Sequence, residues 1–138
     1  MKLKLFPFFI LVLCLSFSSC SSSDDDSSNT DETEQPDDTP FAKGDFVSVA
    51  HPTTGTATVN HDKSELQLTS FKTDSGPLLE LYLTTALDAE DFISLGVLKG
   101  INGDYTYSIP ENTDLSKYKY VIVWCVDFSV NFGYAILE

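Results

Sequence analysis

One run of residues, Tyr118 to Gly133, constrains the fold of this chain more than any other. It is the longest apolar stretch outside the N-terminus, and it holds the only tryptophan, Trp124, followed directly by Cys125. β-Branched and aromatic residues dominate the run, and these residue types favour strands. Because the run is too short and too often interrupted by polar residues to cross a membrane as a helix, it predicts a central, buried β-strand.

The two faces of this predicted strand differ in character, because side chains alternate between faces with a period of two. One face is wholly apolar or aromatic and carries Tyr118, Tyr120, Ile122, Trp124, Val126 and Phe128. The other is apolar in the middle and charged at both ends, and carries Lys119, Val121, Val123, Cys125 and Asp127. We expect the all-apolar face to point into the core, although alternation alone does not decide which face is inward.

The overall charge limits the classes of partner. The chain has 138 residues, a formal net charge of −13 and no arginine, and its length suits a single domain of ordinary size. Nucleic-acid binding needs a basic face, so nucleic acid is not an expected partner. Bidentate recognition of carboxylate or phosphate is also unexpected, because arginine is the usual residue for it.

The N-terminus has the pattern of an export signal. Lys2 and Lys4 precede an apolar run that ends at Phe17-Ser18-Ser19-Cys20, and the run is shorter than a spanning helix needs. The last four residues resemble the lipobox of bacterial lipoproteins, with phenylalanine where leucine is usual. By that resemblance residues 1–19 are a cleaved signal peptide and Cys20 carries lipid, including acyl chains such as palmitate, that anchor the protein in the bilayer. The alternative is an ordinary secretory signal that ends at a cysteine by chance.

Residues 20–40 form a Ser- and Asp-rich segment. Eight residues between Asp24 and Asp38 are acidic and none is apolar, so the segment cannot bury surface to offset its chain entropy. We expect a disordered tether that like charges extend. Acidic residues soon after a lipidated cysteine also resemble surface-export signals, so the expected location is the outer membrane, facing outward.

Residues 41–138 read as the folded domain, in which 13 acidic residues and 6 lysines give a charge of −7. Short alternating segments separated by Gly, Pro, Asn and Asp predict strands at 55–59, 65–71, 79–84, 92–98 and 104–109, then the central run and 133–137. The only suggestion of a helix is a short turn at 87–92. Seven or eight short strands predict an all-β fold, a single antiparallel β-sandwich, and we expect a monomer.

An ordered set of short motifs extends from Gly55 to Leu137. It comprises Phe71, Gly76-Pro77, Tyr82-Leu83, Leu95 to Gly100, Gly103, Tyr105 or Tyr107, Ile109-Pro110, Leu115, Tyr118, Val121 to Cys125, Phe128, Val130, Phe132-Gly133, Ala135 and Leu137. In this order the motifs resemble the electron-transfer DM13 (DM-thirteen) domain family. The resemblance implies a role in extracellular or cell-surface electron transfer, with a redox protein as partner. It also implies that Cys125, with Trp124 beside it, acts as a bare redox thiol or as a ligand to a prosthetic group such as haem.

The residues themselves leave the role of Cys125 open. A free cysteine in a strand is commonly a small buried hydrophobe, whereas an unpaired thiol in an exported protein is unusual. Asp127 follows on the same predicted face about 7 Å away, and a carboxylate there disfavours the thiolate that nucleophilic chemistry needs. A fast attacking thiol is therefore not expected, while ligation of iron or slow disulfide formation stays open.

Other candidate ligands are few. His51 and His61 are the only imidazoles, both in predicted loops, and either would be a second ligand only if the fold brought it near Cys125. Asp74, Asn102 and Asp104 lie in predicted loops and suggest Ca²⁺ at most weakly, because no EF-hand pattern is present. No catalytic motif is recognisable, so no enzyme is expected. The alternative function is a non-redox binding or adhesion module in which Cys125 only packs.

Overall fold

The structure, a computed structural model, describes residues 38–138. The predicted signal peptide, the lipidation site Cys20 and nearly all of the predicted tether lie outside the described residues. Residues 38–40 are exposed and have no regular secondary structure. Within the described part of the chain, no helix is long and apolar enough to cross a membrane.

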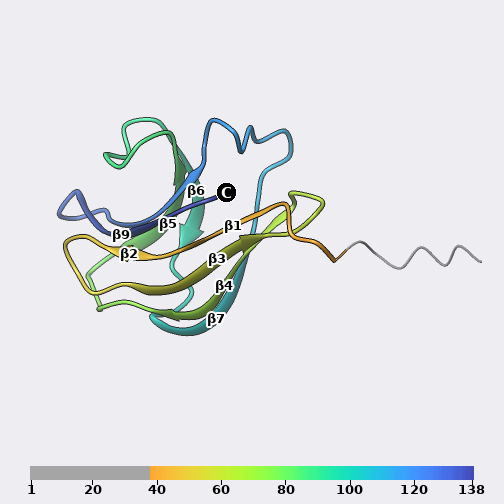
Figure 1. Cartoon of the computed structure of the whole chain (residues 1–138). Coiled ribbons are helices and arrows are strands. Elements are labelled where there is room, and N and C mark those ends of the chain that lie inside the picture. The colour runs from red at the N-terminus through yellow and green to blue at the C-terminus, as the bar shows by residue number, and fades with distance from the viewer. Residues whose placement is uncertain (1–37) are drawn as a thin grey trace, which may run out of the picture. The chain divides into compact units, whose positions relative to one another are not determined.

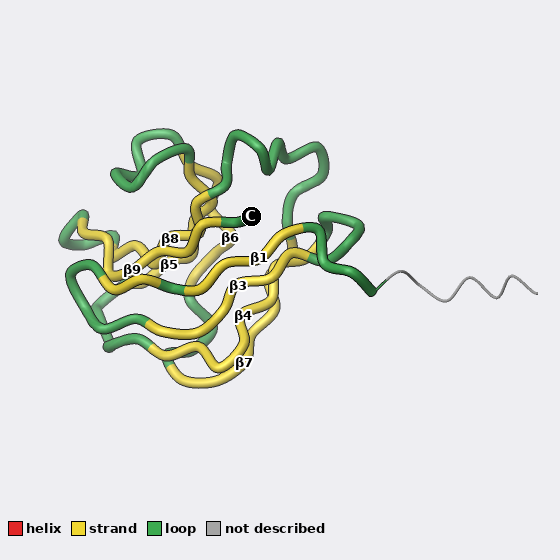
Figure 2. The backbone as a smooth tube through the Cα atoms, viewed as in Figure 1, coloured by secondary structure: helices red, strands yellow, loops and turns green. Residues whose placement is uncertain are grey.

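In residues 38–138, nine strands form two antiparallel sheets (Figures 1 and 2). The four-stranded sheet has the order β1 (Ala42–Asp45), β3 (Thr54–Val59), β4 (Glu65–Lys72), β7 (Asn102–Ser108). The five-stranded sheet has the order β2 (Val47–Ser48), β9 (Val130–Ile136), β8 (Tyr120–Cys125), β5 (Leu79–Thr84), β6 (Phe92–Val97). The predicted all-β, antiparallel sandwich is thereby confirmed. The short helical turn expected at 87–92 is wrong, since residues 85–91 form a loop.

The sequence patterns missed β1 and β2, because both are short and mostly polar. The chain passes from one sheet to the other between them, and Phe46 at the crossing is buried. Lys43 exchanges backbone hydrogen bonds with Glu138, at 3.0 Å each way, so β1 also closes against the C-terminal end. Long-range pairing, and not local preference, makes these residues strands.

The predicted single strand from Tyr118 to Gly133 is wrong in extent, because the run is a hairpin. β8 ends at Cys125, residues 126–129 form a turn, and β9 returns from Val130. Ser129 adopts a positive φ of 51° at this turn. Phe128, predicted to face the core, lies at the tip of the hairpin and is 73 % exposed.

The predicted inward face of the central strand is also wrong. Val121, Val123 and Cys125 are fully buried members of the core, whereas Tyr120 and Trp124 are half-buried on the outer face. In the register with β5 the inner residues lie opposite Leu83, Leu81 and Leu79. Their small side chains fit the space of about 10 Å between packed sheets, and the opposite sheet fills the rest with larger residues, among them Leu66, Leu68, Phe71 and Tyr107.

Gly44 provides a test of how β1 closes the sandwich. A Cβ at this position would lie 1.9 Å from the backbone oxygen of Ile136, which has no side-chain freedom to move away. We therefore expect Gly44→Ala to lower the free energy of unfolding by about 2–4 kcal/mol, measured by urea denaturation followed through Trp124 fluorescence. The control is Lys43→Ala on the same strand, expected within about 0.5 kcal/mol of wild type. Equal stability of the two variants would mean that β1 is not held against β9.

Candidate functional site

Cys125, the predicted redox residue, is the free cysteine of the described chain and is 0 % exposed. It is the last residue of β8, with Leu79 of β5 and Val130 of β9 as its partners in the two adjacent strands. The next residue, Val126, donates a backbone hydrogen bond to the Leu78 carbonyl (2.9 Å), which holds the start of the hairpin turn against β5. The thiol is therefore an inner residue at the end of the sandwich that carries the hairpin tip.

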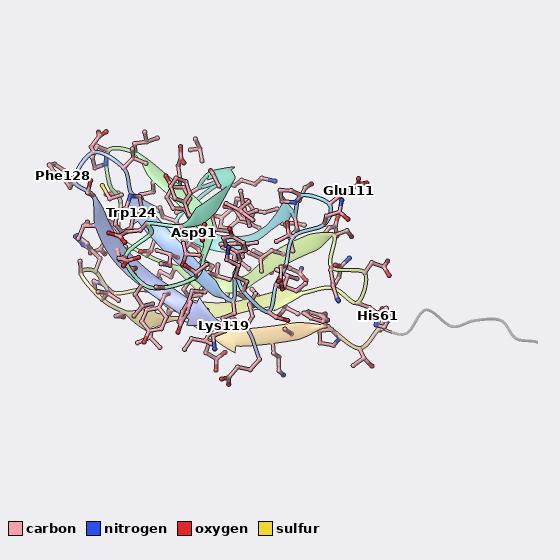
Figure 3. The ribbon with its side chains drawn as sticks, turned by 90° about the horizontal axis from the view of Figure 1, so that it is seen from above. His61, Asp91, Glu111, Lys119, Trp124 and Phe128 are labelled. Carbon is pink, nitrogen blue, oxygen red and sulfur yellow. The ribbon has the colours of Figure 1, made fainter. Side chains whose placement is uncertain are left out.

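Neither histidine contributes an imidazole to Cys125. His51 Nδ1 lies 3.0 Å from a carboxylate oxygen of Asp74, and its ring stacks on Phe132 with centroids 3.8 Å apart. His61 lies in the β3–β4 turn, at the end of the sandwich opposite the hairpin tip, as Figure 3 shows for His61 and Phe128. No group of three or more His, Cys, Asp or Glu within residues 38–138 is placed to hold a metal ion.

A haem bound through Cys125 does not fit these surroundings. A fully buried sulfur leaves no open coordination path. A nearby surface depression of about 190 Å³, formed by residues 75–79 with Val97, Leu98 and Ile101, contains no histidine or cysteine. In this structure the sulfur therefore acts as a packed core atom and not as an available ligand.

The loop residues considered for Ca²⁺ make contacts within the protein instead. Asp74 pairs with His51. Asp104 Oδ1 accepts a hydrogen bond from the Ser70 amide (2.7 Å), where Ser70 has a positive φ of 50° beside a bulge in the β4–β7 register. The backbone N–H and carbonyl of Asn102 both bond to the Tyr105 hydroxyl. The carboxylates of Asp74 and Asp104 therefore have partners within the protein, and Asn102 contributes through its backbone.

Trp124 belongs to a different surface from Cys125, since adjacent residues of a strand point to opposite faces. On the outer face of the five-stranded sheet, Tyr82 stacks on Phe92 with ring centroids 4.2 Å apart and on Trp124 at 6.4 Å. The result is a row of three aromatic rings across β6, β5 and β8. The structure therefore does not bring the two predicted cofactor residues into one site.

Carboxylates accompany this aromatic row. Glu80 lies opposite Trp124 in the β5–β8 register and shares the outer face of β5 with Tyr82. The pKa of the Tyr82 phenol is raised, first by burial and then by the hydrogen bond and negative charge of Glu80. At neutral pH Tyr82 therefore stays a neutral hydrogen-bond donor beside an acidic group.

The loop of residues 85–91 lies over the same face and adds further carboxylates. The Asn131 side-chain amide of β9 donates to the Leu87 carbonyl (3.2 Å), while its oxygen has no hydrogen-bond partner within the described residues. At the other end of the loop, the Tyr118 hydroxyl donates to Asp91 (2.8 Å) and Lys117 Nζ lies 3.2 Å from the same carboxylate. The loop is thus fixed at both ends and presents its acidic side chains outward.

A comparison with protein families identifies the domain. Residues 45–137 match the family model described as Electron transfer DM13. The chain belongs to this family. The match covers nearly all of the described sandwich, including β8 and Cys125, and confirms the resemblance seen in the sequence. No curated protein and no solved structure matches the chain significantly.

Sequence reasoning missed the outer aromatic face of this DM13 domain. Period-two alternation did group Tyr120, Ile122 and Trp124, but it assigned them to the core. The usable signal is that Glu80 alternates with Tyr82 on β5, since a carboxylate seldom points between two packed sheets. The alternation of Glu80 with Tyr82 shows that Trp124 faces outward only once the strand register is known, because the register places Glu80 beside Trp124.

Burial of the thiol gives a direct prediction. A thiol reagent should modify Cys125 at least about a hundredfold more slowly in the folded protein than in denaturant, because modification requires local opening. The measurement is the rate of labelling, with peptide mapping to locate the label at Cys125. Labelling at the same rate with and without denaturant would show that the sulfur is accessible.

The contact that fixes the 85–91 loop gives a pH prediction. The pKa of Asp91 is lowered, first by the hydrogen bond from Tyr118 and then by that from Lys117. Because the folded-state pKa lies below the unfolded one, the carboxylate stabilises the fold above its ordinary pKa, and this contribution is lost as the pH falls through the folded value. Tyr118→Phe should therefore move the Asp91 pKa upward in a carboxyl NMR titration. Tyr134→Phe, a matched change at a tyrosine of β9 that is not among the hydrogen-bond partners of Asp91, should leave it unchanged.

Proposed function

We propose that this chain is a membrane-anchored extracytoplasmic lipoprotein whose sandwich serves as an accessory module of an electron-transfer system. The observation that carries the proposal is the match of residues 45–137 to the electron transfer DM13 family. The signal pattern ending at Cys20 supports export and lipidation, and the acidic residues after it support display on the outer membrane. The partner in this proposal is a redox protein, in keeping with the electron-transfer description of the family.

In this proposal Cys125 is a bare thiol that the end of the sandwich masks. The hairpin turn at 126–129 and the neighbouring Leu79 would have to move before another molecule reached the sulfur. With a disulfide of a partner protein as oxidant, the Cys125 thiol loses its proton to solvent and its sulfur attacks one partner sulfur. A mixed disulfide forms, the partner S–S bond breaks, and the second partner sulfur leaves as thiolate.

The second candidate is a binding or adhesion module without redox chemistry. The complete burial of Cys125 favours it, because a small sulfur-bearing side chain packs well between Leu79 and Val130 without any further role. The partly exposed aromatic row on the opposite face would then carry the function.

The thiol chemistry separates the two candidates. Protein purified from the membranes of its own host is incubated with a disulfide-bearing redox partner and analysed without reductant. The redox module gives a mixed disulfide at Cys125 that Cys125→Ser abolishes. Val123→Ala is the matched control on the same inner face, and it should keep the crosslink while accounting for lost packing. An absorption spectrum of the same sample is expected to show no Soret band sensitive to Cys125→Ser, since the buried sulfur offers no haem site.

The anchor is tested by replacing the proposed lipidation site. Cys20→Ala should remove the acyl chains and release the protein from the membrane fraction, because lipid chains provide the membrane affinity. Fractionation and mass spectrometry of the mature N-terminus are the measurements. Cys14→Ala, which changes a cysteine inside the apolar run, should leave retention intact. Retention of the Cys20→Ala protein in the membrane fraction would contradict the lipoprotein proposal.

A further inference from the structure

The outer face of the five-stranded sheet carries a patch that the proposed thiol chemistry does not use. We call it the aromatic face and define it by Tyr82, Phe92 and Trp124 with Leu87 of the overlying loop and Phe128 of the hairpin tip. Three of these side chains are strongly exposed: Phe92 at 45 %, Leu87 at 41 % and Phe128 at 73 %. In Figure 3 the labels Phe128, Trp124 and Asp91 follow one another across this side of the domain.

The charges around the aromatic face are mostly negative, and Lys119, whose ammonium lies over the Tyr120 ring further along β8, is an exception. Glu80 lies beside Trp124, the 85–91 loop contributes Asp88, Glu90 and Asp91, and Asp127 precedes Phe128 in the turn. The lysine that contacts this group, Lys117, is paired with Asp91 and therefore neutralises only one carboxylate. An apolar centre with an acidic rim is complementary to a surface with exposed hydrophobic residues and a basic rim.

The ring geometry argues against a carbohydrate platform. Sugars stack on open aromatic faces, but Tyr82 and Phe92 stack on each other with an interplanar angle of 15°. The Tyr82–Trp124 angle is 24°, so Tyr82 has aromatic neighbours on both strands beside it, and it is only 6 % exposed. Contact with a protein surface needs apolar area and complementary charge more than it needs open ring faces.

We infer that the aromatic face is the docking surface for a redox protein with a lysine-rich face. The inference rests on the proposed electron-transfer function and names the class of partner. Redox encounters commonly use small interfaces of less than about 1,200 Å², so a few exposed apolar side chains with a charged rim are enough to form one. Attraction between opposite charges then speeds the encounter and makes it sensitive to salt.

The test uses the full processed chain in nanodiscs of phosphatidylcholine, which have no net charge to attract a basic probe. The probe is a lysine-rich monohaem c-type cytochrome with zinc in place of iron, so that docking is measured without electron transfer. Trp124 is the only tryptophan, so one indole N–H NMR signal reports on the face. We expect this signal to shift on titration, and the affinity to fall about tenfold between 20 and 200 mM salt.

A matched pair of charge variants locates the binding surface. Asp88→Asn with Glu90→Gln removes two charges from the loop over the face, and should weaken binding about fivefold or more. Asparagine keeps the acceptor that Asp88 Oδ1 offers to the Glu90 amide. Asp62→Asn with Glu111→Gln removes two exposed charges at the opposite end of the sandwich and should change affinity less than twofold. Figure 3 labels Glu111 and His61, the neighbour of Asp62 in the chain, at that end. Phe128→Ser tests the apolar part and should also weaken binding several-fold.

Three results would overturn the inference: an indole signal that does not move, equal weakening by both charge pairs, or a shift produced by a neutral oligosaccharide without salt dependence. A different result would contradict the electron-transfer proposal without contradicting the docking surface. If the zinc cytochrome docks as expected but no redox exchange occurs with its iron form or with a disulfide partner, docking stands and the redox function does not.

Discussion

Packing between the two sheets at the inner side of β8 is the interaction on which the rest of the structure depends. Val121, Val123 and Cys125 are fully buried and lie opposite Leu83, Leu81 and Leu79. Each larger aliphatic side chain buried in this way contributes about 1.5–3 kcal/mol, and β8 is paired on both edges, with β5 and with β9. Small inner residues also let the two sheets approach closely enough to enclose Phe71 and Tyr107 from the opposite side.

Which face of β8 points inward determines where thiol chemistry and surface recognition can occur. The sulfur is inside and the indole is outside on adjacent residues of one strand, so thiol chemistry and surface recognition are separated by the thickness of a sheet. Both the buried sulfur of Cys125 and the outward indole of Trp124 lie within the region that matches the electron transfer DM13 family. A masked thiol needs an opening step, whereas Phe92, Leu87 and Phe128 of the outer face are exposed as the domain stands.

Several parts of the fold were predictable because local patterns agree with the tertiary arrangement. Leu66 and Leu68 alternate with polar residues on β4, and both are buried. The hairpin at residues 126–129 was not predictable from alternation, because Asp127 and Ser129 continue the period of the strand while the backbone turns. Strands β1 and β2 were missed because Gly44 and its polar neighbours become strand only through bonds to distant residues such as Glu138.

The amino-acid sequence by itself determined an acidic, all-β, antiparallel domain with a single thiol in its folded part, because composition and period-two alternation are local properties of the chain. Only the tertiary structure decided that Trp124 faces out and Cys125 faces in. Alternation defines two faces but does not rank them. Which face points inward depends on which side chains have the volume that fits against the opposite sheet. Here Val121, Val123 and Cys125 fit, while Tyr120 and Trp124 stay half-buried on the outer face.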